Sequence, residues 1–198
     1  MDRNSFEGKT YTPDQPAEWP EAAEFTTCVF EGCDLTKVPL AKARFQDCRF
    51  ENCNFSNVRL SGVSLEQVRF NGCKMTGADF SVCNSFLISG RFENCILSFC
   101  LFKKLPLRET VFKNCEIREA DFSGADLSSS SFAGCDLSGA IFDRTNLEKA
   151  DLRSARNFSI DPVKNRVRKA KFSWPGVMGL LAGFGISVGP EEVKEKED

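Results

Sequence analysis

The sequence predicts a solenoid, a chain that winds repeatedly around one axis, and two columns of residues predict it. A large apolar residue stands at every fifth position, from Phe25 to Phe80 and again from Leu87 to Leu152. All 26 of these central residues are Phe, Leu, Ile or Met, and the phase shifts by two residues between 81 and 86. The residue two places before each central residue is mostly small, and the positions around them are polar.

A period of five fits neither regular element. Five residues of an α-helix rotate the apolar stripe by about 140°, and an odd step along a β-strand moves the side chain to the opposite face. The chain must therefore turn a corner once in every pentad to keep each fifth residue inside. Coils built in this way stack along one axis, and the stacked central residues form the core.

Stretches such as ADFSGADLSSSSFAGCDLSGAIF, residues 120–142, resemble the pentapeptide-repeat family, whose motif is roughly A(D/N)LXX. The resemblance covers about residues 23–155. It implies an all-β solenoid, a right-handed quadrilateral β-helix with four pentads in each coil. In the second phase Phe and Leu alternate at the central position, which requires an even number of pentads per coil without selecting four. The repeats then make about 6–7 coils, a rod roughly 30 Å long at strand spacing.

The chain divides into four parts. Residues 1–24, rich in proline, are expected to form an N-terminal cap, and Phe6 and Tyr11 are candidates for a partial extra coil there. Residues 25–155 form the β-helix, and residues 156–188 form a C-terminal capping segment with a short helix. Residues 189–198 are a charged tail, which we expect to be disordered.

The stretch SWPGVMGLLAGFGISV predicts the short C-terminal helix. Ser173 is a candidate N-cap, Pro175 suits the first turn, and Gly183 or Gly185 can end the helix. Its apolar residues either cover the last coil or, as the resemblance implies for several relatives, make a homodimer contact. These candidate cap or dimer residues are Trp174, Val177, Leu180, Leu181 and Phe184.

All ten cysteines lie in the small column. With twenty residues per coil, pairs such as Cys28 and Cys48 stack with parallel side chains, a poor geometry for a disulfide. Their spacing follows the repeat and not the rules of metal ligands, so we expect neither a metal nor a cofactor. A reactive thiolate needs a basic and partly exposed setting. We therefore expect the cysteines to be buried small fillers.

Two groups of residues are candidates for a partner-binding surface. Phe86 and Phe99 lie outside the core register near the phase shift, followed by Lys103 and Lys104; the alternative is that the rings tuck against neighbouring coils. Glu116 and Asp136 stack one coil apart in the acidic second half of the rod. Residues 25–113 hold twelve Lys/Arg and eight Asp/Glu, whereas residues 116–155 hold four and eight. The run KNRVRKAK, residues 164–171, adds five basic residues with no acidic one. We expect an ordinary solvated surface there and no direct nucleic-acid binding.

Composition argues against an enzyme. The chain has no histidine, the commonest general base, and one tyrosine against 19 phenylalanines. No apolar run is long enough to span a membrane and the N-terminus has no signal-peptide core, so we expect a cytoplasmic protein. An enzyme remains a remote alternative, in which Glu116 and Asp136 would supply an acid/base pair.

A non-catalytic binding scaffold is the expected function. Well-understood proteins of the resembled family bind DNA gyrase and related topoisomerases; some resemble a DNA duplex in width and charge, and some protect the enzyme from quinolones or toxins. Two features of this chain depart from that group: its net charge is only −2, and just two residues are inserted where the quinolone-protection branch has long loops. A general protein-interaction scaffold unrelated to topoisomerases is the alternative.

Overall fold

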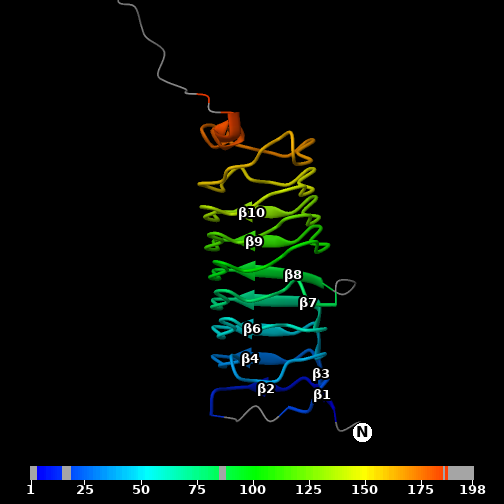
Figure 1. Ribbon diagram of the computed structural model, residues 1–198. Coiled ribbons are helices and arrows are strands. Elements are labelled where there is room, and N and C mark those ends of the chain that lie inside the picture. Colours follow the sequence, from blue (N-terminus) through cyan, green and yellow to red (C-terminus); the bar gives the residue numbers. More distant parts are fainter. Residues whose placement is uncertain (1–3, 15–18, 85–87, 185, 187–198) are drawn as a thin grey trace, which may run out of the picture.

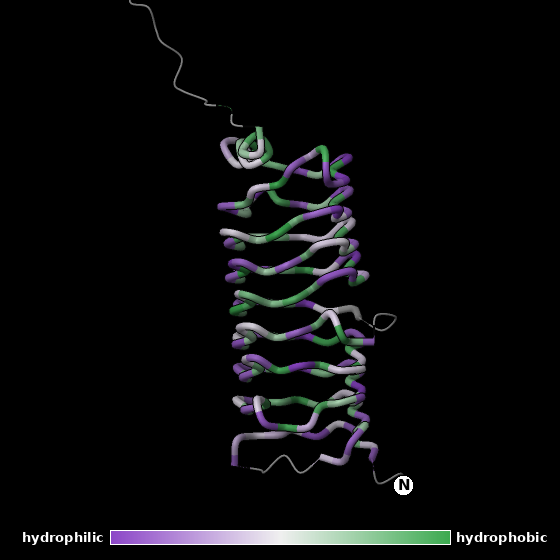
Figure 2. The backbone as a smooth tube through the Cα atoms, viewed as in Figure 1, coloured by the Kyte–Doolittle hydropathy of each residue, from purple (hydrophilic) through white to green (hydrophobic). Residues whose placement is uncertain are grey.

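The computed structural model describes residues 4–14, 19–84, 88–184 and 186. The chain is a column of stacked coils, a parallel β-solenoid of about six turns, with its N-terminus at one end and a helical segment at the other (Figure 1). Apolar and polar residues alternate along every coil (Figure 2). The fold class predicted from the pentads is therefore confirmed.

Within the described residues, ten short strands mark the faces of the solenoid, and every pairing between them is parallel. They are β1 (Ser5–Glu7), β2 (Thr10–Tyr11), β3 (Glu24–Thr26), β4 (Val29–Glu31), β5 (Arg44–Gln46), β6 (Arg49–Glu51), β7 (Ser64–Asn71), β8 (Ile88–Glu93), β9 (Val111–Lys113) and β10 (Ser131–Ala133). On the remaining faces, coils are joined by isolated parallel bridges such as Asp126 to Asn146.

The register of these pairs fixes the number of pentads per coil. Phe25 lies opposite Phe45 and Phe30 lies opposite Phe50, so one coil takes twenty residues and four pentads. Between β7 and β8 the offset rises to 22, with Phe70 opposite Phe92, and it returns to twenty between β8 and β9. The two-residue insertion inferred from the phase shift is thus confirmed, although residues 85–87 lie outside the described residues.

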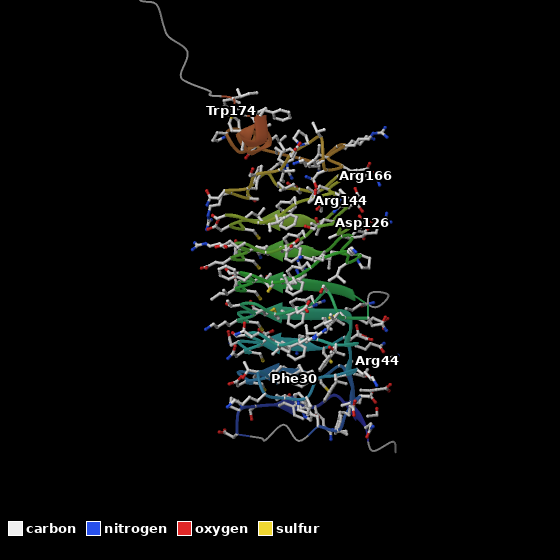
Figure 3. All side chains as sticks on the ribbon, in the orientation of Figure 1. Phe30, Arg44, Asp126, Arg144, Arg166 and Trp174 are labelled. Atoms are coloured by element: carbon white, nitrogen blue, oxygen red, sulfur yellow. The ribbon has the colours of Figure 1, made fainter. Side chains whose placement is uncertain are left out.

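The central column forms the core. Its 25 described members, which exclude only Leu87, are all buried. Aromatic rings stack face to face along two long columns and one short column, which consists of Phe6, Phe25 and Phe45. In the first, consecutive ring centroids lie 4.5–5.2 Å apart from Tyr11 through Phe30, labelled in Figure 3, to Phe132. In the second, Phe80 to Phe142, they lie 4.8–5.4 Å apart. Each ring therefore makes the same offset-stacked contact with the equivalent ring of the next coil.

The small column does more than fill space. Eight of its cysteine thiols donate to a backbone carbonyl of the coil below; for example, Cys53 Sγ donates to Phe30 O at 3.2 Å and Cys73 Sγ to Phe50 O at 3.3 Å. Thr145 and Asn165 supply an oxygen and a nitrogen donor in the same way, to Phe122 O and Phe142 O. These side chains therefore satisfy carbonyls inside the solenoid that would otherwise lose a hydrogen bond.

Parallel pairing extends beyond residues 25–155 in both directions. At the start, β1 and β2 pair with β3 and β4, and Trp19 packs on the rings of Phe25 and Phe30 with centroids 5.0 and 5.4 Å away. At the other end, Asn146 pairs with Arg166 and Asp151 pairs with Lys171. The aromatic end residues shield the first coil from water, which an open solenoid end requires.

The C-terminal helix differs from the prediction because it consists of 3₁₀ turns, η2 (Gly176–Leu180) and η3 (Ala182–Phe184). Pro175, and not Ser173, stands at the N-cap, and no side chain of the described residues caps the turn. Gly179 lies against Phe158, where a Cβ would clash with the Phe158 carbonyl oxygen and ring. Its own carbonyl accepts a hydrogen bond from the Ile160 amide at 3.0 Å. Because these contacts with Phe158 and Ile160 fix the segment, and because it is rich in glycine, it forms only short turns with i→i+3 hydrogen bonds.

Phe122 tests the stacked core. Its ring is fully buried between Phe102 and Phe142, with centroids 5.1 and 5.4 Å away. We expect Phe122→Ala to lower the free energy of unfolding by about 3–5 kcal/mol, because the lost contacts leave a cavity. Urea denaturation followed by circular dichroism measures this. The exposed Phe99→Ala is the control and should change stability by less than about 0.5 kcal/mol; equal losses for the two variants would contradict the assignment.

Candidate interaction surfaces

Phe99 projects from a corner of the solenoid. Its side chain is 52% exposed, and its backbone adopts a left-handed conformation with φ of 61°. Ile96, 37% exposed, precedes it on one face, and Leu101, half-buried, follows it on the next. We name these three residues the Phe99 corner. The alternative that this ring tucks against a neighbouring coil is not what the structure shows; Phe86 lies outside the described residues.

The corner is unusual in its chemistry. Most residues two places after a central residue are left-handed, with exceptions such as Lys37 and Val82, and at the equivalent corner in neighbouring coils they are Asn57, Gly77, Glu119 and Gly139. Glycine and asparagine suit this conformation, whereas a bulky residue is strained in it. Among the described left-handed residues Phe99 is the only aromatic one. A strained, exposed aromatic residue is more consistent with binding than with folding.

The two lysines that follow the corner differ from each other. Lys103 Nζ lies 2.9 Å from Asp121 Oδ2 in the next coil. Lys104 is exposed, has no ion-pair partner among the described residues, and lines a depression with Gly124 and Arg144. Lys104 is therefore the one of the two that is available to a partner.

Glu116 and Asp136 are paired by a parallel bridge, as expected, but their side chains have different environments. Asp136 is only 3% exposed and accepts hydrogen bonds from Arg118 Nε at 2.9 Å, Ser138 Oγ at 2.6 Å and Asn157 Nδ2 at 2.9 Å. Burial alone would raise the pKa of Asp136, but the bonds from Ser138, Asn157 and Arg118 outweigh it and hold that pKa far below its usual range. Its carboxylate serves the fold, while Glu116 remains exposed.

Most acidic residues of the second half are also occupied within the chain. Between the same two coils, Lys103 pairs with Asp121, Arg108 with Asp126 and Arg118 with Asp136, each pair on a different face. Asp and Asn residues just before the central position also accept a bond from the backbone amide two residues later. Examples span the rod: Asp34, Asn54, Asp79, Asp121, Asp126, Asp136, Asn146 and Asp151. The main role of the repeated Asp or Asn of the motif is therefore to stabilise the turn, and its contribution to surface charge is secondary.

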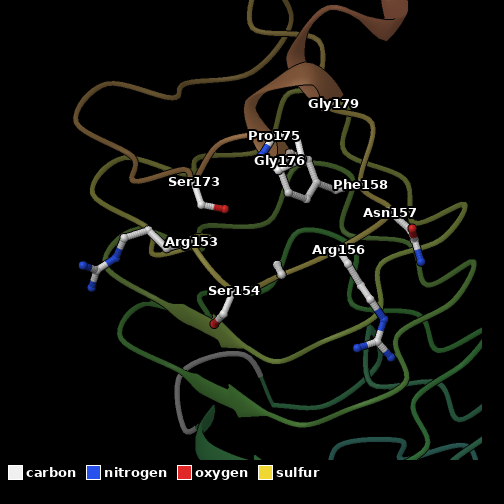
Figure 4. A pocket seen from close by; sticks show the side chains of 10 residues that line it. Arg153, Ser154, Arg156, Asn157, Phe158, Ser173, Pro175, Gly176 and Gly179 are labelled. Atoms are coloured by element: carbon white, nitrogen blue, oxygen red, sulfur yellow. The ribbon is translucent and has the colours of Figure 1, made fainter.

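The C-terminal end exposes several apolar side chains. Trp174 is 77% and Phe184 51% exposed, whereas Val177, Leu180 and Leu181 are half-buried. Leu180 packs against the core, so part of this segment covers the last coil. Below it lies a cavity of about 440 Å³ with Phe158 and Pro175 on its wall (Figure 4). Arg153 and Arg156 extend to opposite sides of it, and Arg153 Nη2 lies 2.6 Å from Asp151 Oδ2.

All ten cysteines are free and buried. Burial raises the pKa of Cys83 and of Cys100 to about 12, so these thiols stay protonated at neutral pH. Their role is packing and hydrogen bonding, as the repeat register indicated.

The twenty-residue register, the buried central column and the left-handed corners together define a quadrilateral β-solenoid repeat protein. A family model described as the pentapeptide repeat region matches residues 23–86 and 84–152. The chain therefore belongs to the pentapeptide repeat family.

One solved structure agrees with this fold. A trypsin-treated variant of QnrB1, a plasmid-mediated fluoroquinolone resistance protein, is 23% identical, with 96% of each chain covered and a TM-score of 0.54. HetL, a pentapeptide repeat protein involved in heterocyst differentiation regulation from the cyanobacterium Nostoc sp. strain PCC 7120, is 15% identical over 85% of this chain and 83% of its own, with a TM-score of 0.37. At such identities the QnrB1 similarity shows the fold alone. A comparison with curated protein sequences gives no match. Within the described ranges, no helix is long and apolar enough to cross a bilayer.

The sequence analysis did not single out Ile96 and Leu101, the two exposed or half-buried apolar residues on either side of Phe99 in the chain. A signal was present, because the position before the central residue is polar in most coils, and these two are apolar there. It also missed a column of arginines in the first half of the rod, which is described below.

Asp136 gives the solenoid a pH-dependent contribution to stability. Its folded pKa lies below the unfolded value of about 3.9, so the stabilisation is complete well above that value and is lost progressively as pH falls through it toward the folded pKa. We expect Asp136→Asn to lose about 1–3 kcal/mol at pH 7, and the difference from wild type to shrink below about pH 4. Urea denaturation at several pH values measures it, with the exposed Glu119→Gln as control. A difference independent of pH would contradict the charged-carboxylate role.

The buried thiols should be inert in the folded protein. With Ellman's reagent near pH 8, we expect less than about one thiol per protein molecule to react within minutes, because the reagent needs an accessible thiolate. All ten should react after unfolding in guanidinium chloride. Several thiols reacting in native buffer as fast as a free thiol would show that the small column is accessible.

Proposed function

We propose that this protein is a non-catalytic scaffold that binds a protein partner through the Phe99 corner. The observation that carries the proposal is the exposed Phe99 ring, held at a left-handed backbone position and flanked by Ile96 and Leu101. Aromatic side chains that sit in a cluster of apolar neighbours are typical anchors of protein interfaces. Lys104, exposed at the next corner of the same coil, adds a positive charge to this part of the surface.

Rigidity supports this role. Each coil is fixed to its neighbours by parallel pairing and by stacked rings, so the corner is positioned before a partner arrives. A preorganised surface loses little conformational entropy on binding. An acid/base function has less support, because the Asp136 carboxylate is buried and already accepts four hydrogen bonds.

DNA gyrase or a related topoisomerase is the first partner we propose to test. Support comes from the pentapeptide repeat family and from the resistance function named for QnrB1. Imitation of DNA by an acidic surface has less support, since most second-half aspartates are bonded within the chain. A scaffold for a partner unrelated to topoisomerases remains the alternative, and it uses the same corner.

A gyrase supercoiling assay with and without a quinolone tests the partner. We expect the wild-type protein at micromolar concentration to relieve quinolone inhibition, and Phe99→Ala to need at least about tenfold more protein. Trp174→Ala, which removes an exposed aromatic residue at the end of the rod, is the matched control and should act as wild type. No effect of the wild type on gyrase, even at micromolar concentration, would contradict gyrase as the partner.

The corner itself is tested separately by affinity capture from a native bacterial lysate. Immobilised wild-type protein and Trp174→Ala should retain the same partner, and Phe99→Ala should lose it. Equal retention by all three proteins would contradict the Phe99 corner as the binding surface.

A further inference from the structure

Three arginines form a column on the first half of the rod. Arg49 in β6 lies opposite Arg69 in β7, and Arg69 lies opposite Arg91 in β8. All three side chains are exposed, and each stands just before a buried central phenylalanine. Neighbouring strands lie about 4.8 Å apart, so the three arginines follow one another in a line across the sheet at that spacing. We name them the arginine column.

Such a column is unfavourable for the free protein. Like charges directly opposite each other on paired strands destabilise a sheet. Arg91 has a counter-ion, since its Nε lies 2.7 Å from Glu93 Oε1. Among the described residues neither Arg49 nor Arg69 has an ion-pair partner, and Glu51 on the same face instead accepts a hydrogen bond from Asn71. Two stacked cations are thus left for a ligand from outside the described chain.

A groove runs beside the column. It has a volume of about 420 Å³ and is lined by the three arginines together with Val68, Gly90 and Val111. Gly90 lies in the coil that contains the two-residue insertion and stands in the small column, where it has no side chain to fill the space. The groove therefore combines a small apolar floor with a single line of positive charge.

We propose that the arginine column binds an acidic α-helix of a protein partner, laid along the rod axis. An α-helix with carboxylates at i, i+4 and i+7 presents one negative charge per turn, about 5.4 Å apart. The arginines repeat at about 4.8 Å, and over three rungs the mismatch is about 1 Å, within the reach of flexible side chains. Guanidinium groups also match carboxylates in charge and geometry.

The narrow charge distribution favours this ligand over a nucleic acid. Glu51 and Glu93 stand two residues after Arg49 and Arg91 on the same strands, and Asp47 lines the groove on the other side. A duplex carries negative charge over its whole width and would meet these carboxylates. A helix with one acidic stripe would place its charges on the arginines alone.

This surface is separate from the Phe99 corner. Arg91 precedes Phe92 on one face, whereas Phe99 follows Leu97 on the next, and the groove contains no residue of the Phe99 corner. The inference therefore does not rest on the proposed function, and either can fail without the other.

Fluorescence anisotropy with a synthetic peptide tests the column. The probe is a labelled alanine-based helix with glutamates at i, i+4, i+7 and i+11, and the control peptide has the same composition with its glutamates spread around the helix. We expect the striped peptide to bind the full chain, and to bind at least about tenfold more weakly to the double variant Arg49→Gln/Arg69→Gln. Arg69→Lys, which keeps the charge, should retain most of the binding. Arg59→Gln, an exposed arginine on another face, should bind as wild type.

Salt and stability give two further readouts. Raising the salt concentration from about 50 to about 300 mM should weaken the binding of the striped peptide to the protein, because the contact is electrostatic. The double variant should melt no lower than wild type, because it removes a repulsion. Equal binding of both peptides, or an unchanged affinity in the double variant, would overturn the proposal. So would tighter binding of a short DNA duplex that the same variant abolishes, since the column would then be a nucleic-acid site.

Discussion

Stacking of identical central side chains in a twenty-residue register is the interaction on which this structure depends. Each ring contacts its equivalent in the coils above and below at about 5 Å, as Phe102, Phe122 and Phe142 do. The same register brings strands into parallel pairing and aligns the small column, so carbonyls inside the solenoid meet donors such as Cys53 and Thr145. A two-residue insertion shifts the register locally, and the next coil returns to an offset of twenty.

The register also governs the surface. A residue on the outside always lies beside the residue one coil away, so favourable and unfavourable pairs are both repeated along the rod. In the second half this produces ion pairs on three faces between the same two coils, such as Lys103 with Asp121. In the first half it places Arg49 against Arg69 with no counter-ion in the described chain. A nearly neutral protein thus keeps strongly local charge patterns.

Features that do not help the solenoid fold are the most informative about function. A phenylalanine at a left-handed corner and a line of like charges each work against stability, whereas glycine or asparagine and alternating charges would serve the fold better. Both features lie near the coil with the two-residue insertion, which carries β8 and Arg91 and is followed within the same turn by Phe99. Local disagreement with an otherwise consistent sequence is expected where a surface is used for binding.

The sequence by itself determined the solenoid, its inward residues and the site of the insertion, because a five-residue period leaves only one way to bury the apolar column. It could not decide the number of pentads per coil, which depends on hydrogen-bond register between residues twenty apart, such as Phe25 and Phe45. Nor could it show that Asp136 is buried beneath Arg118 and Asn157, or that Phe99 points outward. The short 3₁₀ turns also depended on the tertiary structure, since contact with Phe158 fixed the path of Gly179. The five-residue period determines which residues lie inside the solenoid. The chemistry of the surface depends on residues about twenty positions apart, which become neighbours only when the chain coils.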